Sequence, residues 1–173
     1  MSDNGDEARQ PDHEPRIGAE AVSRGRTITE ADLVSFAALT GDWHPQHADA
    51  EWASRSRFGE RVAHGMLVLS FAVGLVDFDP ERVVALRGLD SATFKRPVMI
   101  GDTIRVRSRV EAARPLDDEH LLVAFGWRVE NQDGKLVARA RVEALWRRDP
   151  ENGDARRDGE RAADDLYGDL VLL

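Results

Sequence analysis

The feature that most constrains this chain is a change of hydrophobic periodicity near residue 80. From Gly65 to Val76 almost every residue is apolar, which in a water-soluble protein indicates a helix that the rest of the fold buries on all sides. After Pro80 the apolar residues recur at every second position, which is the spacing of β-strands with one buried face. The chain therefore predicts an α+β fold with an antiparallel sheet around one very apolar helix.

The clearest alternation lies on either side of a turn at residues 131–134. Apolar side chains occupy the odd positions from Leu121 to Val129 and the even positions from Leu136 to Trp146. Two such segments joined by a short turn containing Asn, Asp and Gly predict a long hairpin. A further strand is expected between residues 104 and 110, where arginines alternate with aliphatic residues.

Two short helices are expected before residue 60. Thr29, with Asp32 three residues later, forms a capping-box pattern at the start of the first helix, and Gly41 ends it. Asp49 is a good N-cap for a second, which runs out near residues 58–59. Pro45 is expected to prevent helix continuation between them, which leaves residues 42–47 as a constrained turn.

The formal net charge of −8 is carried by the two ends of the chain. Residues 1–16 sum to −3 and residues 149–173 to −5, so residues 17–148 are neutral overall. We expect one folded domain over residues 17–148 and flexible acidic tails over 1–16 and 149–173. The second tail ends in apolar residues that either dock on a surface or stay loose. A neutral body with acidic ends does not favour nucleic-acid binding.

Composition also excludes several classes of site. The chain has no cysteine, so disulfides, thiolate–zinc sites, iron–sulfur clusters and cysteine nucleophiles are ruled out. Its first residues carry acids and prolines where a secretion signal needs a basic flank and an apolar run. The longest apolar run is far shorter than the roughly 20 residues that span a bilayer. We therefore expect a cytoplasmic protein that has no membrane span.

The chemistry concentrates between the short helices and the buried one. Asp42 and His47 flank Pro45, and a carboxylate and an imidazole that converge on one water form an acid–base pair. Gly65 opens the buried helix, where unpaired backbone N–H groups can stabilise an anionic oxygen. Such a site suits addition of water to a double bond next to a thioester carbonyl.

Here the chain resembles the MaoC-like hydratase and dehydratase family, especially R-specific enoyl-CoA hydratases. The family motif reads Asp-x-Asn-Pro-x-His-x-Asp, then an aromatic residue with Gly, then Ala-His-Gly-Met. The resemblance covers roughly residues 20–148, and the segment 94–102 is similar to the family's strand entering the sheet. One position departs, because His44 stands where the family has asparagine. The matching residues, in order, are Asp42, Pro45, His47, Asp49, Phe58, Gly59, Ala63, His64, Gly65 and Met66.

The resemblance implies a hot-dog fold, with an antiparallel sheet wrapped around a long central helix. It implies that Asp42 and His47 are the catalytic pair, that the Gly65 amide polarises the thioester carbonyl, and that Ser70 helps to hold the pair or the water. The implied reaction is reversible hydration of trans-2-enoyl thioesters, carried on coenzyme A or an acyl carrier protein, to 3-hydroxyacyl thioesters. It implies no cofactor and no metal. Because a single hot-dog leaves a sheet edge and an apolar face uncovered, we expect a homodimer or a larger homo-oligomer.

Other interpretations of the same residues stay open. His44 and His47, with Asp42 and Asp49, could be ligands of a divalent metal in a hydrolase. The chain could instead be a non-catalytic acyl-binding subunit of a hetero-oligomeric dehydratase, or a hot-dog thioesterase.

Several single residues also have a plain structural interpretation. His64 is expected to hydrogen-bond nearby backbone, and Ser70 could bond a carbonyl one turn back. Trp43 and Trp52 are expected in the core or the wall of the acyl site. Two groups of cations compete to bind coenzyme A phosphates or an acidic carrier protein, and these are Arg55, Arg57 and Arg61 on one side and Lys95 and Arg96 on the other.

Overall fold

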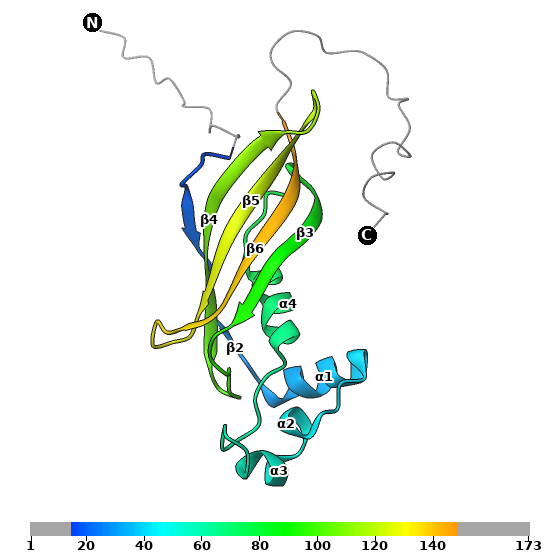
Figure 1. The fold of residues 1–173 in the computed structure, drawn as a ribbon, viewed down its shortest axis with the longest axis vertical. Helices are drawn as coiled ribbons and strands as arrows, with labels where there is room; N and C mark the ends of the chain where they lie inside the picture. The colour runs from blue at the N-terminus through cyan, green and yellow to red at the C-terminus, as the bar shows by residue number, and fades with distance from the viewer. Residues whose placement is uncertain (1–14, 149–173) are drawn as a thin grey trace, which may run out of the picture.

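A curved antiparallel sheet packs against one helix in the computed structural model, which describes residues 15–148 (Figure 1). The predicted acidic tail over residues 149–173 lies outside the described residues, and so does the tail over residues 1–16 apart from its last two residues. The helices are α1 (Glu30–Thr40), α2 (Pro45–Ala48), α3 (Ala50–Ser54) and α4 (Gly65–Leu75). The strands are β1 (Glu20–Val22), β2 (Arg26–Thr27), β3 (Val83–Phe94), β4 (Thr103–Pro115), β5 (His120–Glu130) and β6 (Leu136–Arg147).

The sheet is built around the predicted hairpin. Its strand order is β1-β4-β5-β6-β3, β2 pairs with the start of β4, and every pairing is antiparallel. In the hairpin Leu121 lies opposite Trp146 and Val129 opposite Ala138, which confirms the register that the alternation predicts. Gly134 closes the turn with a φ of 71°, a conformation that glycine adopts without strain. β4 contains the third predicted strand.

The core lies between the sheet and α4, which confirms the expected α+β layers. Trp127, Val123 and Val106 from the sheet are at most 2% exposed, and they belong to one apolar cluster with Leu67 and Ala72 of α4. Burying side chains of this size stabilises the fold by about 1.5–3 kcal/mol each. Because this packing fixes α4 against the sheet, it also fixes the position of the helix's first turn.

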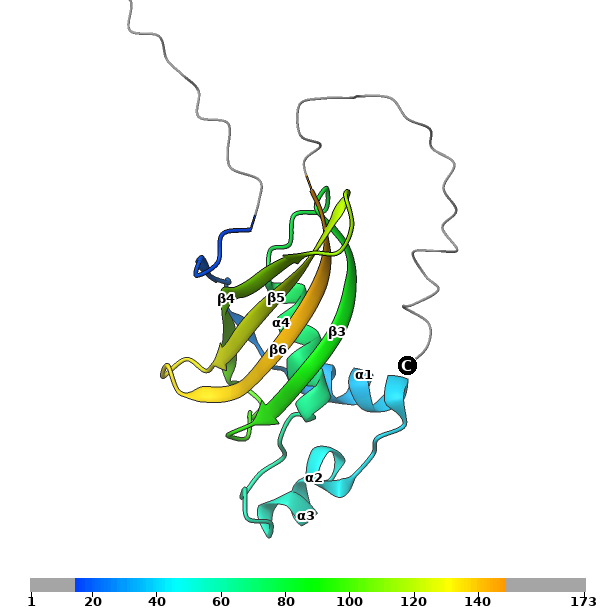
Figure 2. The same ribbon diagram turned by 45° about the horizontal axis from the view of Figure 1, so that its top comes forward.

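The helices α1, α2 and α3 lie together beyond one end of the sheet, near the start of α4 (Figure 2). Thr29 and Asp32 form the predicted capping box at the start of α1, and Gly41 ends the helix with a φ of 78°. The helix is interrupted before Pro45 as expected, but residues 42–47 are not a turn throughout, because Pro45 begins the short helix α2. Proline suits this first position because the missing N–H would have no intrahelical partner there.

Two further sequence expectations need correction. α4 is eleven residues long and is not buried on all sides, because Met66 and Val73 are 54% and 38% exposed. The segment after Phe94 is also not a strand entering the sheet. β3 ends at Phe94, and residues 95–102 form the connection to β4, with one bridge between Val62 and Met99.

The face of the sheet away from α4 carries ion pairs that cross between strands. Glu143 of β6 accepts hydrogen bonds from Arg87 of β3 and from Arg114 of β4, the latter at 3.4 Å. Arg141 pairs with Asp90 and, at 3.2 Å, with Glu111. Since side chains alternate between the two faces of a strand, these charges sit opposite the apolar core. Among residues 15–148 no helix is long and apolar enough to cross a bilayer.

Candidate active site

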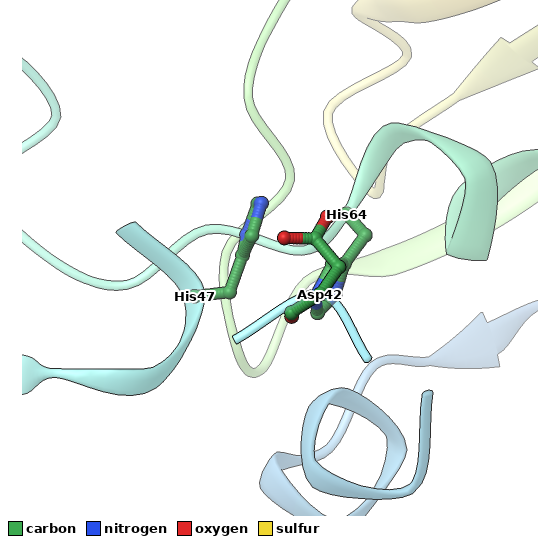
Figure 3. A group of neighbouring side chains, drawn as sticks. All are labelled: Asp42, His47 and His64. Carbon is green, nitrogen blue, oxygen red and sulfur yellow. The ribbon is translucent and has the colours of Figure 1, made fainter. Parts of the chain in front are cut away.

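The structure brings together Asp42 and His47, the predicted pair. Asp42 follows Gly41, the residue that ends α1, and His47 lies on α2. A carboxylate oxygen of Asp42, a ring nitrogen of His47 and a ring nitrogen of His64 all lie within 4.8 Å of one another (Figure 3). The Asp42 side chain is exposed, His47 is half-buried and His64 is buried. The burial of the three side chains thus increases from Asp42 to His64.

A short hydrogen bond sets the orientation and tautomer of His47. Its Nδ1 lies 2.6 Å from the carbonyl oxygen of Val62, and a carbonyl can only accept, so Nδ1 carries the proton. In the neutral ring Nε2 then keeps its lone pair and can accept a proton from a bound water. Burial is the main cause of a lowered pKa for His47, with the nearby His64 acting in the same direction. A pKa lowered in this way favours the neutral ring at pH 7.

His64 holds the two members of the pair in place. It is 2% exposed, and its Nε2 donates a hydrogen bond to the Asp42 backbone carbonyl at 3.0 Å, which confirms the predicted backbone contact. Its ring also stacks on His47, with centroids 3.8 Å apart and planes 24° apart. Nδ1 of His64 is buried and has no hydrogen-bond partner within the part of the chain that the structure describes.

His44, the departure from the family motif, acts as the cap of α2. Its Nδ1 accepts a hydrogen bond from the backbone N–H of Gln46 at 3.2 Å. Asparagine is among the best residues for this task, because its side-chain oxygen accepts the same kind of bond. The ring also meets Trp52 edge-on, with centroids 5.6 Å apart. The substitution thus keeps a helix cap and leaves the Asp42–His47 pair intact.

The residues that could bind a metal in the structure differ from the metal ligands predicted from the sequence. The cluster contains His64 rather than His44, and Asp49 instead caps α3 by accepting from the Trp52 N–H at 2.9 Å. The lone pairs of a stacked His47 and His64 lie in neighbouring, nearly parallel planes. An ion bound by both rings would therefore require one ring to leave the stack.

Gly65 and Ser70, the other predicted site residues, have different surroundings. Gly65 begins α4, and no side chain among the residues that the structure describes caps that helix, so its first-turn N–H groups are left for a ligand. A Cβ at Gly65 would lie 2.7 Å from Cζ of Phe94, which explains why this position needs glycine. Ser70 is exposed and donates to the Met66 carbonyl at 2.8 Å. It forms no hydrogen bond with Asp42 or His47 in the described chain.

A cavity of about 400 Å³ opens beside the pair and contains both His47 and Gly65 in its wall. The aromatic residues of this wall are Phe58 and Phe94. Neither Trp43 nor Trp52, the aromatic residues expected there, lines the cavity, and they are 52% and 39% exposed. The sequence does not identify Phe94 as a residue of the cavity wall, because its pattern is that of an ordinary strand residue. Phe94 reaches the cavity only because β3 ends near the start of α4.

Comparison with known proteins fits this geometry. The model of the MaoC-like domain matches residues 12–130. The chain belongs to the MaoC-like domain family. It is 33% identical over 96 residues to an (R)-specific enoyl-CoA hydratase of Rhodospirillum rubrum, a match covering 56% of this chain and 67% of that protein. It is also 46% identical over 91 residues to "Protein MaoC" of Klebsiella aerogenes, covering 52% of this chain but only 27% of the longer relative.

Solved structures place the MaoC-like chain in the hot-dog fold. A protein from Archaeoglobus, described as a monoamine oxidase regulatory protein, aligns with a TM-score of 0.74 and 40% identity, covering 78% of this chain and 92% of that one. A Mycobacterium tuberculosis protein with a double hotdog fold aligns with a TM-score of 0.71 at 18% identity, covering 86% of this chain and 47% of its own. The predicted fold class is thereby confirmed.

Proposed function

We propose that this protein is a hydro-lyase that adds water reversibly across a trans-2-enoyl thioester to give a 3-hydroxyacyl thioester. The observation that carries the proposal is the convergence of the Asp42 carboxylate and the His47 ring beside the open first turn of α4. Relatives named as (R)-specific enoyl-CoA hydratases support the same reaction class.

In this mechanism Asp42 and His47 bind the attacking water between them. Because Nδ1 of His47 is committed to the Val62 carbonyl, Nε2 accepts the water proton as the oxygen bonds to C3 of the substrate. Electron density moves to the thioester carbonyl, where the Gly65 N–H and the helix dipole stabilise the developing negative charge. A proton from the pair then reaches C2, so water has been added with no net change in the protein.

The reaction is measured as the loss of enoyl-thioester absorbance with purified protein. We expect Asp42→Asn and His47→Ala each to lower kcat by about 100-fold or more, since general acid–base catalysis contributes about 10²–10⁴-fold. Asp133→Asn, in the turn before β6, is the matched control and should keep the normal rate. Absence of turnover on short, medium, branched and aromatic acyl chains would reject the proposal.

We also propose that the protein forms a homodimer through β3. This twelve-residue strand is one of the two edges of the sheet, no strand among residues 15–148 pairs with its outer side, and such an edge invites pairing with a second copy. Size-exclusion chromatography with mass measurement tests this, and Leu86→Lys with Leu89→Lys should shift a dimer to monomer. A wild-type monomer would refute it. The apolar side chains exposed on the strand are Val84, Leu86, Leu89 and Phe94, and those on the adjacent helix α4 are Met66 and Val73.

A further inference from the structure

Three cations gather on the wall of the active-site cavity. Arg57, Lys95 and Arg96 line the same cavity as His47 and Gly65, and no Asp or Glu of the described part of the chain lines it. Within residues 15–148 none of the three forms an ion pair with a carboxylate. The approach to the catalytic pair is therefore positively charged, although the folded part of the chain is neutral overall.

Neighbouring cations of the sequence have their charges matched elsewhere. Arg55 pairs with Glu51 at 2.8 Å, and Arg61 pairs with Glu30 at 2.7 Å. Neither lines the cavity. Arg57, Lys95 and Arg96 therefore face the cavity with their charge available to a ligand, whereas Arg55 and Arg61 are paired outside it.

The backbone fixes two of these cations against the sheet. The N–H groups of Lys95 and Arg96 both donate to the Val137 carbonyl of β6, at 2.8 and 3.3 Å. The Arg96 guanidinium donates to the Leu136 carbonyl at 2.7 Å and has further N–H groups to offer. The third, Arg57, lies with its guanidinium 5.5 Å from the centre of the Phe58 ring. Two of the three cations are therefore held by β6, the strand that contributes Val137 to the cavity wall.

We propose that Arg57, Lys95 and Arg96 bind the phosphate groups of coenzyme A and so select the carrier of the substrate. This inference rests on the proposed hydratase function and names the form of its thioester. All three cations are exposed, so they form the solvent side of the cavity wall; with the acyl thioester at His47 and Gly65, the phosphorylated end of the carrier would extend towards that side. Three separate positive groups suit the several phosphates of coenzyme A better than the single phosphodiester of a carrier protein.

The test compares trans-2-butenoyl-CoA with trans-2-butenoyl-pantetheine, which presents the same thioester without any phosphate. For the CoA thioester we expect kcat/KM to fall about threefold in Arg57→Ala or Lys95→Ala and about tenfold in the double variant, the size expected for exposed ion pairs. With the pantetheine thioester the variants should match the wild type. Added salt should reduce the wild-type preference for the CoA thioester, because salt screens exposed charges.

Arg55→Ala and Arg61→Ala are the matched controls, since each removes one positive charge outside the cavity. Equal loss on both thioesters, or equal use of both by the wild type, would overturn the phosphate assignment while leaving hydration established. Loss confined to a butenoyl carrier-protein thioester would show that the cations recognise that protein and would also overturn it. If the wild type hydrates neither small thioester, the proposed function itself fails.

Discussion

Replacing Gly65 by alanine tests whether the Phe94 ring is what restricts the start of α4. The new Cβ would lie 2.7 Å from Cζ and 2.9 Å from two further ring carbons of Phe94, so the ring must move. Overpacking of this kind costs about 1–3 kcal/mol, and because Phe94 is 48% exposed its ring can move, so the cost is expected near the middle of that range, about 2 kcal/mol. Alanine in place of glycine within a helix returns up to about 1 kcal/mol.

We therefore expect Gly65→Ala to lower the free energy of unfolding by about 1 kcal/mol, or Tm by about 2–4 °C for a chain of this size. In a Phe94→Ala background the clash is gone, and the same substitution should become neutral or stabilising. Urea denaturation of the four proteins of this double-mutant cycle measures the coupling. The same loss in both backgrounds would refute the role of Phe94. Because the ring also lines the cavity, Gly65→Ala should raise KM.

Three histidine predictions complete the set. The lowered pKa of His47 should place the acid limb of the kcat/KM profile below pH 6.5, and an acid limb above pH 7 would contradict this assignment. The stability that the neutral ring contributes should be complete above pH 6.5 and should decline as the pH falls below that value. His44→Ala should cost about 1 kcal/mol of stability and His44→Asn almost nothing, measured by urea denaturation, because only asparagine still caps Gln46. His64→Phe keeps the stack but loses the bond to Asp42, so kcat should fall while the fold, monitored by circular dichroism, persists.

The sequence predicts well those parts of the fold in which local chemistry and packing agree. The capping box at Thr29 and the hairpin of β5 and β6 are found as expected, since capping and strict alternation act over a few residues. β3 was not predicted, because it is an edge strand exposed on both faces. Polar residues such as Arg87 and Asp90 interrupt its apolar pattern, and register shifts interrupt its pairing with β6.

The site shows the same division between local and distant information. The spacing of Asp42 and His47 around Pro45 predicts their approach, because both lie on one short stretch of chain. The stacking of His64 on His47 and the Phe94 ring over Gly65 depend on how distant segments pack, so no spacing rule gives them. Which cations face the cavity likewise depends on ion pairs such as Arg61 with Glu30, formed across 31 positions.

The charged outer face of the sheet limits how this molecule can grow into an assembly. Arg87, Arg114 and Arg141 are held there by carboxylates on neighbouring strands, and a second layer laid over them would strip water from every one of these groups. Removing hydration from paired charges costs several kcal/mol per ion. The sheet can therefore lengthen sideways, but it resists stacking back to back.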